Sequence, residues 1–154
     1  MTDVEDECVA CALTKDPRAV PGGRILETSR WHLEHAVAPV PLPGWLILRT
    51  IRHTEGITGL DAAEGAELGR LLQLVPQVLK EVTGAERIYV CCFTEVLPHL
   101  HIHLIPRAPD EPLRGPQLFV ERIAAQREPE DPAATAAAAE IAERVRRGLA
   151  GRWT

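Results

Sequence analysis

The stretch His99-Leu100-His101-Ile102-His103-Leu104 alternates histidine with an aliphatic residue at every position. A repeat of two residues is typical of a β-strand, in which successive side chains point to opposite faces. The aliphatic side chains would therefore face a core, while the three imidazoles line the other face ~6.6 Å apart along the strand. Because imidazole can serve as nucleophile, proton carrier or metal ligand near neutral pH, this strand predicts a functional site.

Other segments complete the pattern of a mixed domain. Four of them have the composition of β-strands, at residues 24–28, 31–37, 44–50 and 87–93. A long helix should begin after Asp61, because Asp61 and Glu64 match a capping box and an apolar stripe at helical spacing follows as far as Gly84. Together with the histidine strand at 99–106, these segments predict an α+β domain with a five-stranded antiparallel sheet.

The two ends of the chain are predicted from their composition. Residues 1–23 are expected to be irregular, since no periodic pattern is present there. After the histidine strand, several Pro and Gly residues mark a loop, and the alanine-rich stretch 133–150 strongly favours a helix. We expect residues 1–115 to form the main domain and residues 116–154 to form a helical extension packed on it.

The composition excludes some classes of function. The formal net charge of -5 argues against binding to nucleic acid, which normally requires a basic surface. No apolar stretch approaches the ~18 residues that a membrane helix needs. The acidic stretch at residues 1–7 does not have the features of a signal peptide. We therefore expect a cytoplasmic protein without membrane or nucleic-acid partners.

The four cysteines occur in two pairs. A disulfide framework is not favoured in a chain of 154 residues without a secretion signal. The adjacent Cys91 and Cys92 fall in a predicted strand, so they should point to opposite faces as small strand residues without chemistry, because a free cysteine behaves as a buried hydrophobic residue. The spacing Cys8-x-x-Cys11 indicates either half of a zinc site or two free thiols, because a structural zinc site needs four ligands.

The histidine strand and the order of the elements resemble the histidine triad (HIT) superfamily. Residues 99–105 match its His-φ-His-φ-His-φ-φ signature, in which φ is an apolar residue, and Pro106-Arg107 follows as it often does in bacterial members. The similarity covers roughly residues 8–107. It implies a HIT-like fold, a homodimer, and a reaction at the α-phosphate of a nucleotide or other phosphorylated small molecule through a nucleotidyl-histidine intermediate.

The resemblance also implies a role for individual residues. His101 would be the nucleophile, and its other ring nitrogen would need a hydrogen-bond acceptor so that the attacking nitrogen carries the lone pair. His103 would contact the phosphate or help to transfer a proton to the leaving group. A structural Zn²⁺ would be held by Cys8, Cys11, His53 and His99, a closed Cys₂His₂ set.

Three regions of the sequence depart from the family pattern. Trp45 stands where many members have a histidine, and residues 36–38 contain no carboxylate for a ribose. Glu95 and Val96 replace a glutamine and a hydroxyl residue of the usual phosphate-binding stretch. Glu95, Trp45 and Arg107 are the candidates for substrate binding; alternatively, Trp45 is a packing residue and Arg107 a surface residue at the end of the strand.

Two further functions fit the same residues. A non-catalytic nucleotide-binding or scaffold module with this fold is one, because the carboxylate of Glu95 would repel a phosphate. A metallohydrolase with its metal on His99, His101 and His103 is the other, because His-x-His on a strand can place two imidazoles on one ion. The sequence leaves the identity of the substrate open.

Overall fold

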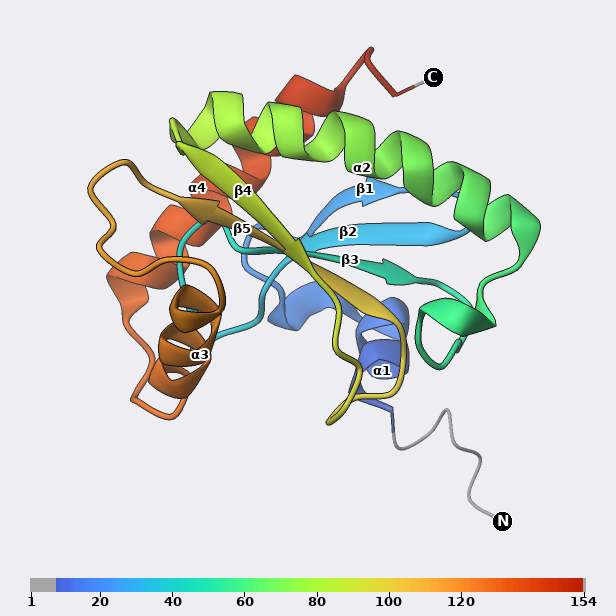
Figure 1. Cartoon of the computed structure of the whole chain (residues 1–154), viewed down its shortest axis with the longest axis horizontal. Coiled ribbons are helices and arrows are strands. Elements are labelled where there is room, and N and C mark those ends of the chain that lie inside the picture. The colour runs from blue at the N-terminus through green and yellow to red at the C-terminus, as the bar shows by residue number, and fades with distance from the viewer. Residues whose placement is uncertain (1–7, 154) are drawn as a thin grey trace.

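One five-stranded antiparallel sheet organises residues 8–153, the part of the chain that the computed structural model describes (Figure 1). The acidic residues 1–7 lie outside this part. The strands are β1 Arg24–Glu27, β2 Trp31–His35, β3 Leu46–Thr50, β4 Arg87–Cys91 and β5 His101–Arg107, in the spatial order β1-β2-β3-β5-β4. The predicted α+β class and the five-stranded antiparallel sheet are confirmed.

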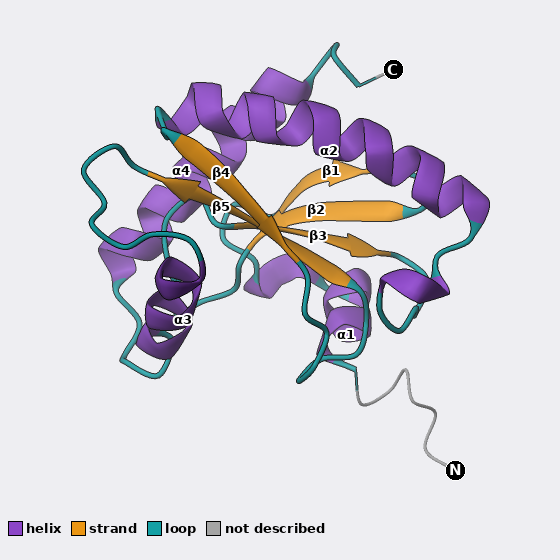
Figure 2. Cartoon of the chain, viewed as in Figure 1, coloured by secondary structure: helices purple, strands orange, loops and turns teal. Residues whose placement is uncertain are grey.

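The helices are divided between the two faces of the sheet (Figure 2). They are α1 Val9–Lys15, α2 Ala62–Thr83, α3 Pro116–Ala125 and α4 Pro132–Leu149, and two short 3₁₀ turns span Pro17–Ala19 and Ile57–Gly59. The packed pair α2 and α4 covers one face, and α1 and α3 lie against the other. None of the helices within residues 8–153 is long and apolar enough to cross a membrane.

The long helix α2 begins and ends where the sequence predicts. The Asp61 carboxylate accepts a hydrogen bond from the Glu64 backbone N–H, and the Glu64 carboxylate accepts one from the Asp61 backbone N–H. Such a cap stabilises a helix by ~1 kcal/mol. Gly84 ends the helix with φ 67°, a left-handed conformation that costs glycine little.

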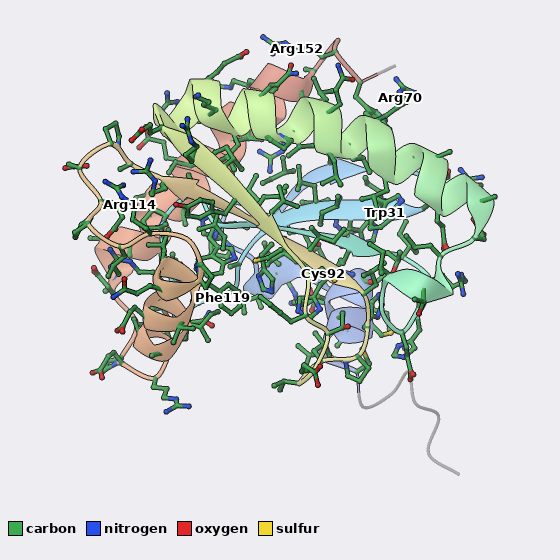
Figure 3. All side chains as sticks on the ribbon, in the orientation of Figure 1. Trp31, Arg70, Cys92, Arg114, Phe119 and Arg152 are labelled. Atoms are coloured by element: carbon green, nitrogen blue, oxygen red, sulfur yellow. The ribbon has the colours of Figure 1, made fainter. Side chains whose placement is uncertain are left out.

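The alternation in β5 separates an apolar face from a polar one. Leu100, Ile102 and Leu104 are almost fully buried in the core beneath α2 and α4. Trp31, labelled in Figure 3, lies in the same core and donates its indole N–H to the Glu64 backbone oxygen at the start of α2. The opposite face of the sheet carries the imidazoles of the strand beside a smaller apolar cluster under α3.

The prediction that residues 1–23 are irregular was wrong for the part that the structure describes. Val9–Lys15 form α1, and Pro17–Ala19 form a 3₁₀ turn. A helix of seven residues is too short to show a clear apolar period, and it is stable only when other parts of the protein hold it. The spacing Cys8-x-x-Cys11 was the available signal, because residues three apart share one helix face.

The carboxy-terminal helices pack on the sheet domain. Ala142, Val145 and Leu149 of α4 are buried in the core, and Arg146 donates hydrogen bonds to the backbone oxygen of Arg24. Gly22 permits this contact, since a Cβ at that position would lie 2.7 Å from the Cβ of Ala142. The predicted helical extension is thus in close contact with β1 and α2.

His35 fixes the loop that connects β2 to β3. The Gly44 backbone N–H donates a hydrogen bond to His35 Nε2 (2.8 Å), so the proton of the neutral ring is on Nδ1, which donates to the Ala36 oxygen (2.9 Å). The side chain is almost fully buried, and this desolvation lowers the pKa of His35 to about 4. The folded protein therefore holds His35 in its neutral form.

We predict that His35 makes the folded state sensitive to acid. Because its folded pKa lies below the value near 6.5 of an unfolded chain, its stabilising contribution is complete above about pH 6.5 and is lost as the pH falls toward about 4. One proton taken up on unfolding lowers the free energy of unfolding by ~1.4 kcal/mol per pH unit in this range. Urea unfolding at a series of pH values gives the free energy of unfolding as a function of pH. The slope of this plot should be smaller in His35→Gln than in wild type by the ~1.4 kcal/mol per pH unit that one proton contributes. Equal slopes would contradict the prediction.

Candidate functional site

A cavity of about 240 Å³ lies on the polar face of the sheet. Its walls come from α1, β2 and the loop after it, the strands β3 and β5, the loop before β5, and α3. Most of the lining is apolar and includes Val9, Leu13, Val37, Pro41, Leu97 and Ile123. His101 and His103 are among the few polar side chains that reach it. A mostly apolar cavity with a few convergent polar groups is typical of a small-molecule site.

His101 has one ring nitrogen held by the backbone. Its Nδ1 lies 2.8 Å from the backbone oxygen of His99. A carbonyl oxygen only accepts, so Nδ1 carries the proton and Nε2 of the neutral ring carries the lone pair. The side chain is half-buried. This is the arrangement that the sequence analysis required of a nucleophilic imidazole.

His103 is next on the same face and shows the opposite arrangement. The rings of His101 and His103 have centroids 5.0 Å apart. The indole Nε1–H of Trp45 donates a hydrogen bond to His103 Nδ1 (3.1 Å). Because the indole nitrogen can only donate, His103 Nδ1 is the acceptor and its proton is on Nε2. Burial, and to a lesser extent the neighbouring His101, lowers the pKa of His103 to about 4.

Four ligand atoms converge beside the cavity. The atoms are Cys8 Sγ, Cys11 Sγ, His53 Nδ1 and His99 Nδ1, and all lie within 4.8 Å of one another. The three closest S–N distances are 3.4, 3.5 and 3.5 Å. A tetrahedral zinc ion with ordinary bond lengths would separate such a sulfur and nitrogen by ~3.6 Å. The donor set and its spacing therefore fit zinc.

The ring of His99 is oriented for this role. Its Nε2 lies 2.8 Å from the Thr50 backbone oxygen and donates to it, which leaves Nδ1 with the lone pair that a metal requires. Such a bond from the non-ligating nitrogen orients metal-binding histidines and raises their basicity. His99 itself lies before β5 and pairs with Glu55 in an isolated bridge, so it is set apart from His101 and His103.

The helix α1 is attached to the sheet near both of its ends. Cys8 and Cys11 join the cluster of candidate metal ligands at its start. Near its end, Arg24 donates a hydrogen bond to the Leu13 backbone oxygen (3.1 Å) and Arg49 donates one to Thr14 Oγ1. The apolar wall that α1 gives to the cavity is therefore held by polar contacts rather than by helix propensity.

A buried ion-pair network lines the floor of the cavity. Glu34 and Arg49 are each 2% exposed and pair at 3.0 Å, and Arg24 pairs with the same carboxylate at 2.8 Å. Removing one partner of such a buried pair typically costs 3–5 kcal/mol. No sequence pattern singled out these residues. The available signal was one charged residue inside each of two predicted strands, at 31–37 and 44–50, while their pairing depends on the register of the folded sheet.

The three candidates for substrate binding are placed differently. Trp45 is fully buried and lines the cavity. Glu95 is exposed, and the neighbouring Val96 is 100% exposed. Arg107 lies at the far end of β5, where it pairs with Glu86 at 2.7 Å. Among residues 8–153, the side chains that line the cavity include neither Glu95 nor Arg107.

Solved structures of histidine triad proteins have the same fold over nearly the whole chain. A zinc-bound histidine triad family protein from Mycobacterium smegmatis superposes with a TM-score of 0.69 at 18% identity, covering 95% of each chain. A hypothetical histidine triad nucleotide-binding protein from Sulfolobus tokodaii gives 0.69 at 16% identity, covering 95% of this chain and 96% of that one. A Hit-like protein involved in cell-cycle regulation from Bartonella henselae gives 0.67 at 17% identity, covering 94% and 98%.

Sequence comparison adds nothing to this likeness. No protein-family model matches the chain, and no curated protein sequence matches it. The similarity in structure shows that the fold is that of the HIT proteins.

Proposed function

We propose that this chain, which has the fold of the histidine triad proteins, is a nucleotide hydrolase or transferase. It would act at the α-phosphate of a nucleoside phosphate, phosphoramidate or dinucleoside polyphosphate. The observation that carries the proposal is the bond from His101 Nδ1–H to the His99 oxygen, which leaves a lone pair on the Nε2 of a side chain that lines the cavity. The apolar wall of the cavity suits a nucleobase.

The proposed reaction has two displacements at phosphorus. In the first, the lone pair of His101 Nε2 forms a P–N bond, and the bond to the leaving group breaks with its electron pair on that group. The His99 oxygen, which accepts the Nδ1–H, stabilises the positive charge that develops on the ring. In the second, water or another acceptor attacks phosphorus, the P–N electrons return to Nε2, and the acceptor loses a proton to solvent.

We predict that the nucleophile cannot be replaced. His101→Asn retains an amide donor for the His99 oxygen but has no nucleophilic ring nitrogen, so turnover should fall by about 1,000-fold or more. Mass spectrometry after acid quench should show a nucleotidyl adduct on wild type that is absent from the variant. Circular dichroism would control for folding. Equal turnover by wild type and variant would refute the mechanism.

One observation supports the alternative of a non-catalytic nucleotide-binding module. Arg49, the cationic side chain within the described lining of the cavity, is already paired with Glu34. A phosphate would thus find no unpaired guanidinium or ammonium group in that lining. Nucleotide binding by calorimetry without any turnover, unchanged in His101→Asn, would favour this alternative.

We propose that Cys8, Cys11, His53 and His99 hold a structural zinc ion. The donor set and the S–N distances support this assignment, and a zinc-bound histidine triad protein shares the fold. The same observations speak against a metal on the three strand histidines. Among residues 8–153, the one group of metal ligands within reach of each other includes His99 but neither His101 nor His103.

We predict about one zinc ion per chain in the purified protein, lost in Cys8→Ser. Cys92→Ser is the matched control, because Cys92 packs against the main core away from the cluster. Elemental analysis and thermal unfolding would check both variants, and only Cys8→Ser should lose metal and unfold at a lower temperature. Metal that survives in Cys8→Ser would instead support the metallohydrolase.

We also propose that the protein is a homodimer that meets its copy at β4. Within residues 8–153, this strand pairs only with β5 and is the edge of the sheet. Large apolar side chains are exposed on this strand and just after it: Val90 is 47% exposed, and Phe93, two residues beyond the end of β4, is 55% exposed. An exposed apolar edge strand is a template for association with another chain.

We predict that Val90→Lys shifts the protein from dimer to monomer in light scattering. A lysine on the edge strand would place a charge in the contact and disfavour pairing. Val96→Lys is the matched control, because Val96 is 100% exposed and lies in the loop after β4. A monomeric wild type, or a dimer that survives Val90→Lys, would exclude this interface.

A further inference from the structure

We propose that Trp45 is a positioning residue that holds His103 as a neutral Nε2–H donor, so that the site acts on substrates whose leaving group departs as an anion. This inference rests on the proposed function and narrows its substrate class. It assigns to Trp45 a role other than stacking on a substrate or filling the core.

In the hydrogen bond between Trp45 and His103, only Trp45 can be the donor. Trp45 Nε1 lies 3.1 Å from His103 Nδ1, and the indole nitrogen has no lone pair to offer. A proton on His103 Nδ1 would place two N–H donors against each other. An imidazolium at His103 would therefore require the Trp45 bond to break.

Trp45 cannot easily turn away from this contact. Its backbone is tied on both sides, because its N–H donates to the Leu42 oxygen (3.0 Å) and its oxygen accepts from the Ala36 N–H (2.8 Å). The indole packs against Phe119 of α3, labelled in Figure 3, with ring centroids 5.5 Å apart. Gly44 before it has φ 91°, and a Cβ there would lie 3.0 Å from Pro106, so the loop fits closely against β5.

The groups around His103 do not favour its protonation. On β5 it faces His101, on α3 the ring of Phe119 (centroids 5.1 Å apart), and on β4 its register partner Cys91. Burial raises the pKa of the Cys91 thiol to about 11, so this neighbour is uncharged at neutral pH. The residues packed on His103 thus provide no carboxylate or thiolate to stabilise an imidazolium.

This environment decides what His103 can give to the substrate. A general acid must transfer its proton to the leaving group, and a neutral imidazole that lost Nε2–H would become a strongly basic anion. His103 can instead donate a hydrogen bond from Nε2 to a non-bridging phosphate oxygen and keep its proton. The leaving group then departs with the electron pair of its bond to phosphorus and with no added proton.

The leaving groups that suit this site are weakly basic oxyanions. A nucleoside polyphosphate released from a dinucleoside polyphosphate is such a group, and so is p-nitrophenolate. An amine released from a phosphoramidate must be protonated before or during bond cleavage, and it would find no acid in His103. Of the substrate classes proposed above, the structure therefore favours the dinucleoside polyphosphates.

The tautomer of His103 can be measured without any substrate. The zinc-loaded full chain would be labelled with ¹⁵N-histidine and examined by long-range ¹H–¹⁵N NMR, with His103 assigned through a His103→Gln variant. We expect an unprotonated, hydrogen-bonded Nδ1 and a protonated Nε2 in wild type. Trp45→Phe should lose this pattern and give a mixture of tautomers.

Phe119→Leu is the matched control for this measurement. Phe119 contacts His103 through its ring but makes no hydrogen bond to it, so the tautomer should be unchanged in this variant. A wild-type His103 with its proton on Nδ1 would overturn the proposal, and so would an unchanged tautomer in Trp45→Phe. The wild-type spectrum decides the question even if a variant fails to fold.

The leaving-group preference is tested by kinetics with three probes of the same nucleoside. These are a dinucleoside polyphosphate, a p-nitrophenyl ester and a phosphoramidate, and wild type should turn over the first two about 100-fold or more faster than the third. In Trp45→Phe the kcat for the phosphoramidate should rise relative to the ester at mildly acidic pH, with little change in KM.

The outcomes separate this inference from the function on which it rests. Comparable rates for all three probes in wild type would overturn the leaving-group preference while leaving the proposed reaction intact. An absence of turnover with every probe would overturn the proposed function and the preference with it. The NMR result would still decide the role of Trp45.

Discussion

His99 connects three parts of the structure, and the site depends on all three connections. Its Nδ1 faces the sulfurs of Cys8 and Cys11, its Nε2 donates to the Thr50 oxygen of β3, and its backbone oxygen accepts the Nδ1–H of His101. A shift of this one residue would move α1, the metal ligands and the proposed nucleophile together. The regular alternation of the sequence does not show this difference, since the first histidine lies in the cluster with Cys8 and Cys11 and the next two face the cavity.

The two faces of the sheet are stabilised in different ways. The face beneath α2 and α4 is apolar, and burial there supplies most of the stability that the sheet needs. The other face buries Glu34 and Arg49 and holds His103 neutral, so every polar group on it needs a partner. The short helix α1 covers part of this face because polar contacts hold it near both ends, and its position then shapes the cavity.

The sequence pattern predicted the elements that have a clear hydrophobic period. It missed the features that form only through tertiary contacts. The strands and α2 follow from period and capping. The four candidate metal ligands came from the resemblance to the HIT family, and the structure brings Cys8, Cys11, His53 and His99 together. The helix α1 was missed, because seven residues carry too little periodicity. The substrate-binding roles of Glu95 and Arg107 stay predictions: one residue is exposed in a loop, the other is paired with Glu86, and neither lines the described cavity. Glu34 and Arg49 were missed because their pairing across two strands is visible only in the folded chain.

The electrostatics of the cavity explain why the orientation of two imidazoles carries so much of the proposed chemistry. Arg49 is neutralised by Glu34, and His103 is held neutral, so the described lining offers a phosphate hydrogen bonds rather than net positive charge. In a water-poor site, a preorganised donor stabilises developing charge without reorganising during the reaction. Fixed tautomers favour phosphate binding in such a site. If the ring of His103 exchanged its donor and acceptor nitrogens, it would present a lone pair to the phosphate anion and repel it. The His99 oxygen and the Trp45 indole fix the two rings in opposite senses, and this leaves one nitrogen to attack and the other to bind.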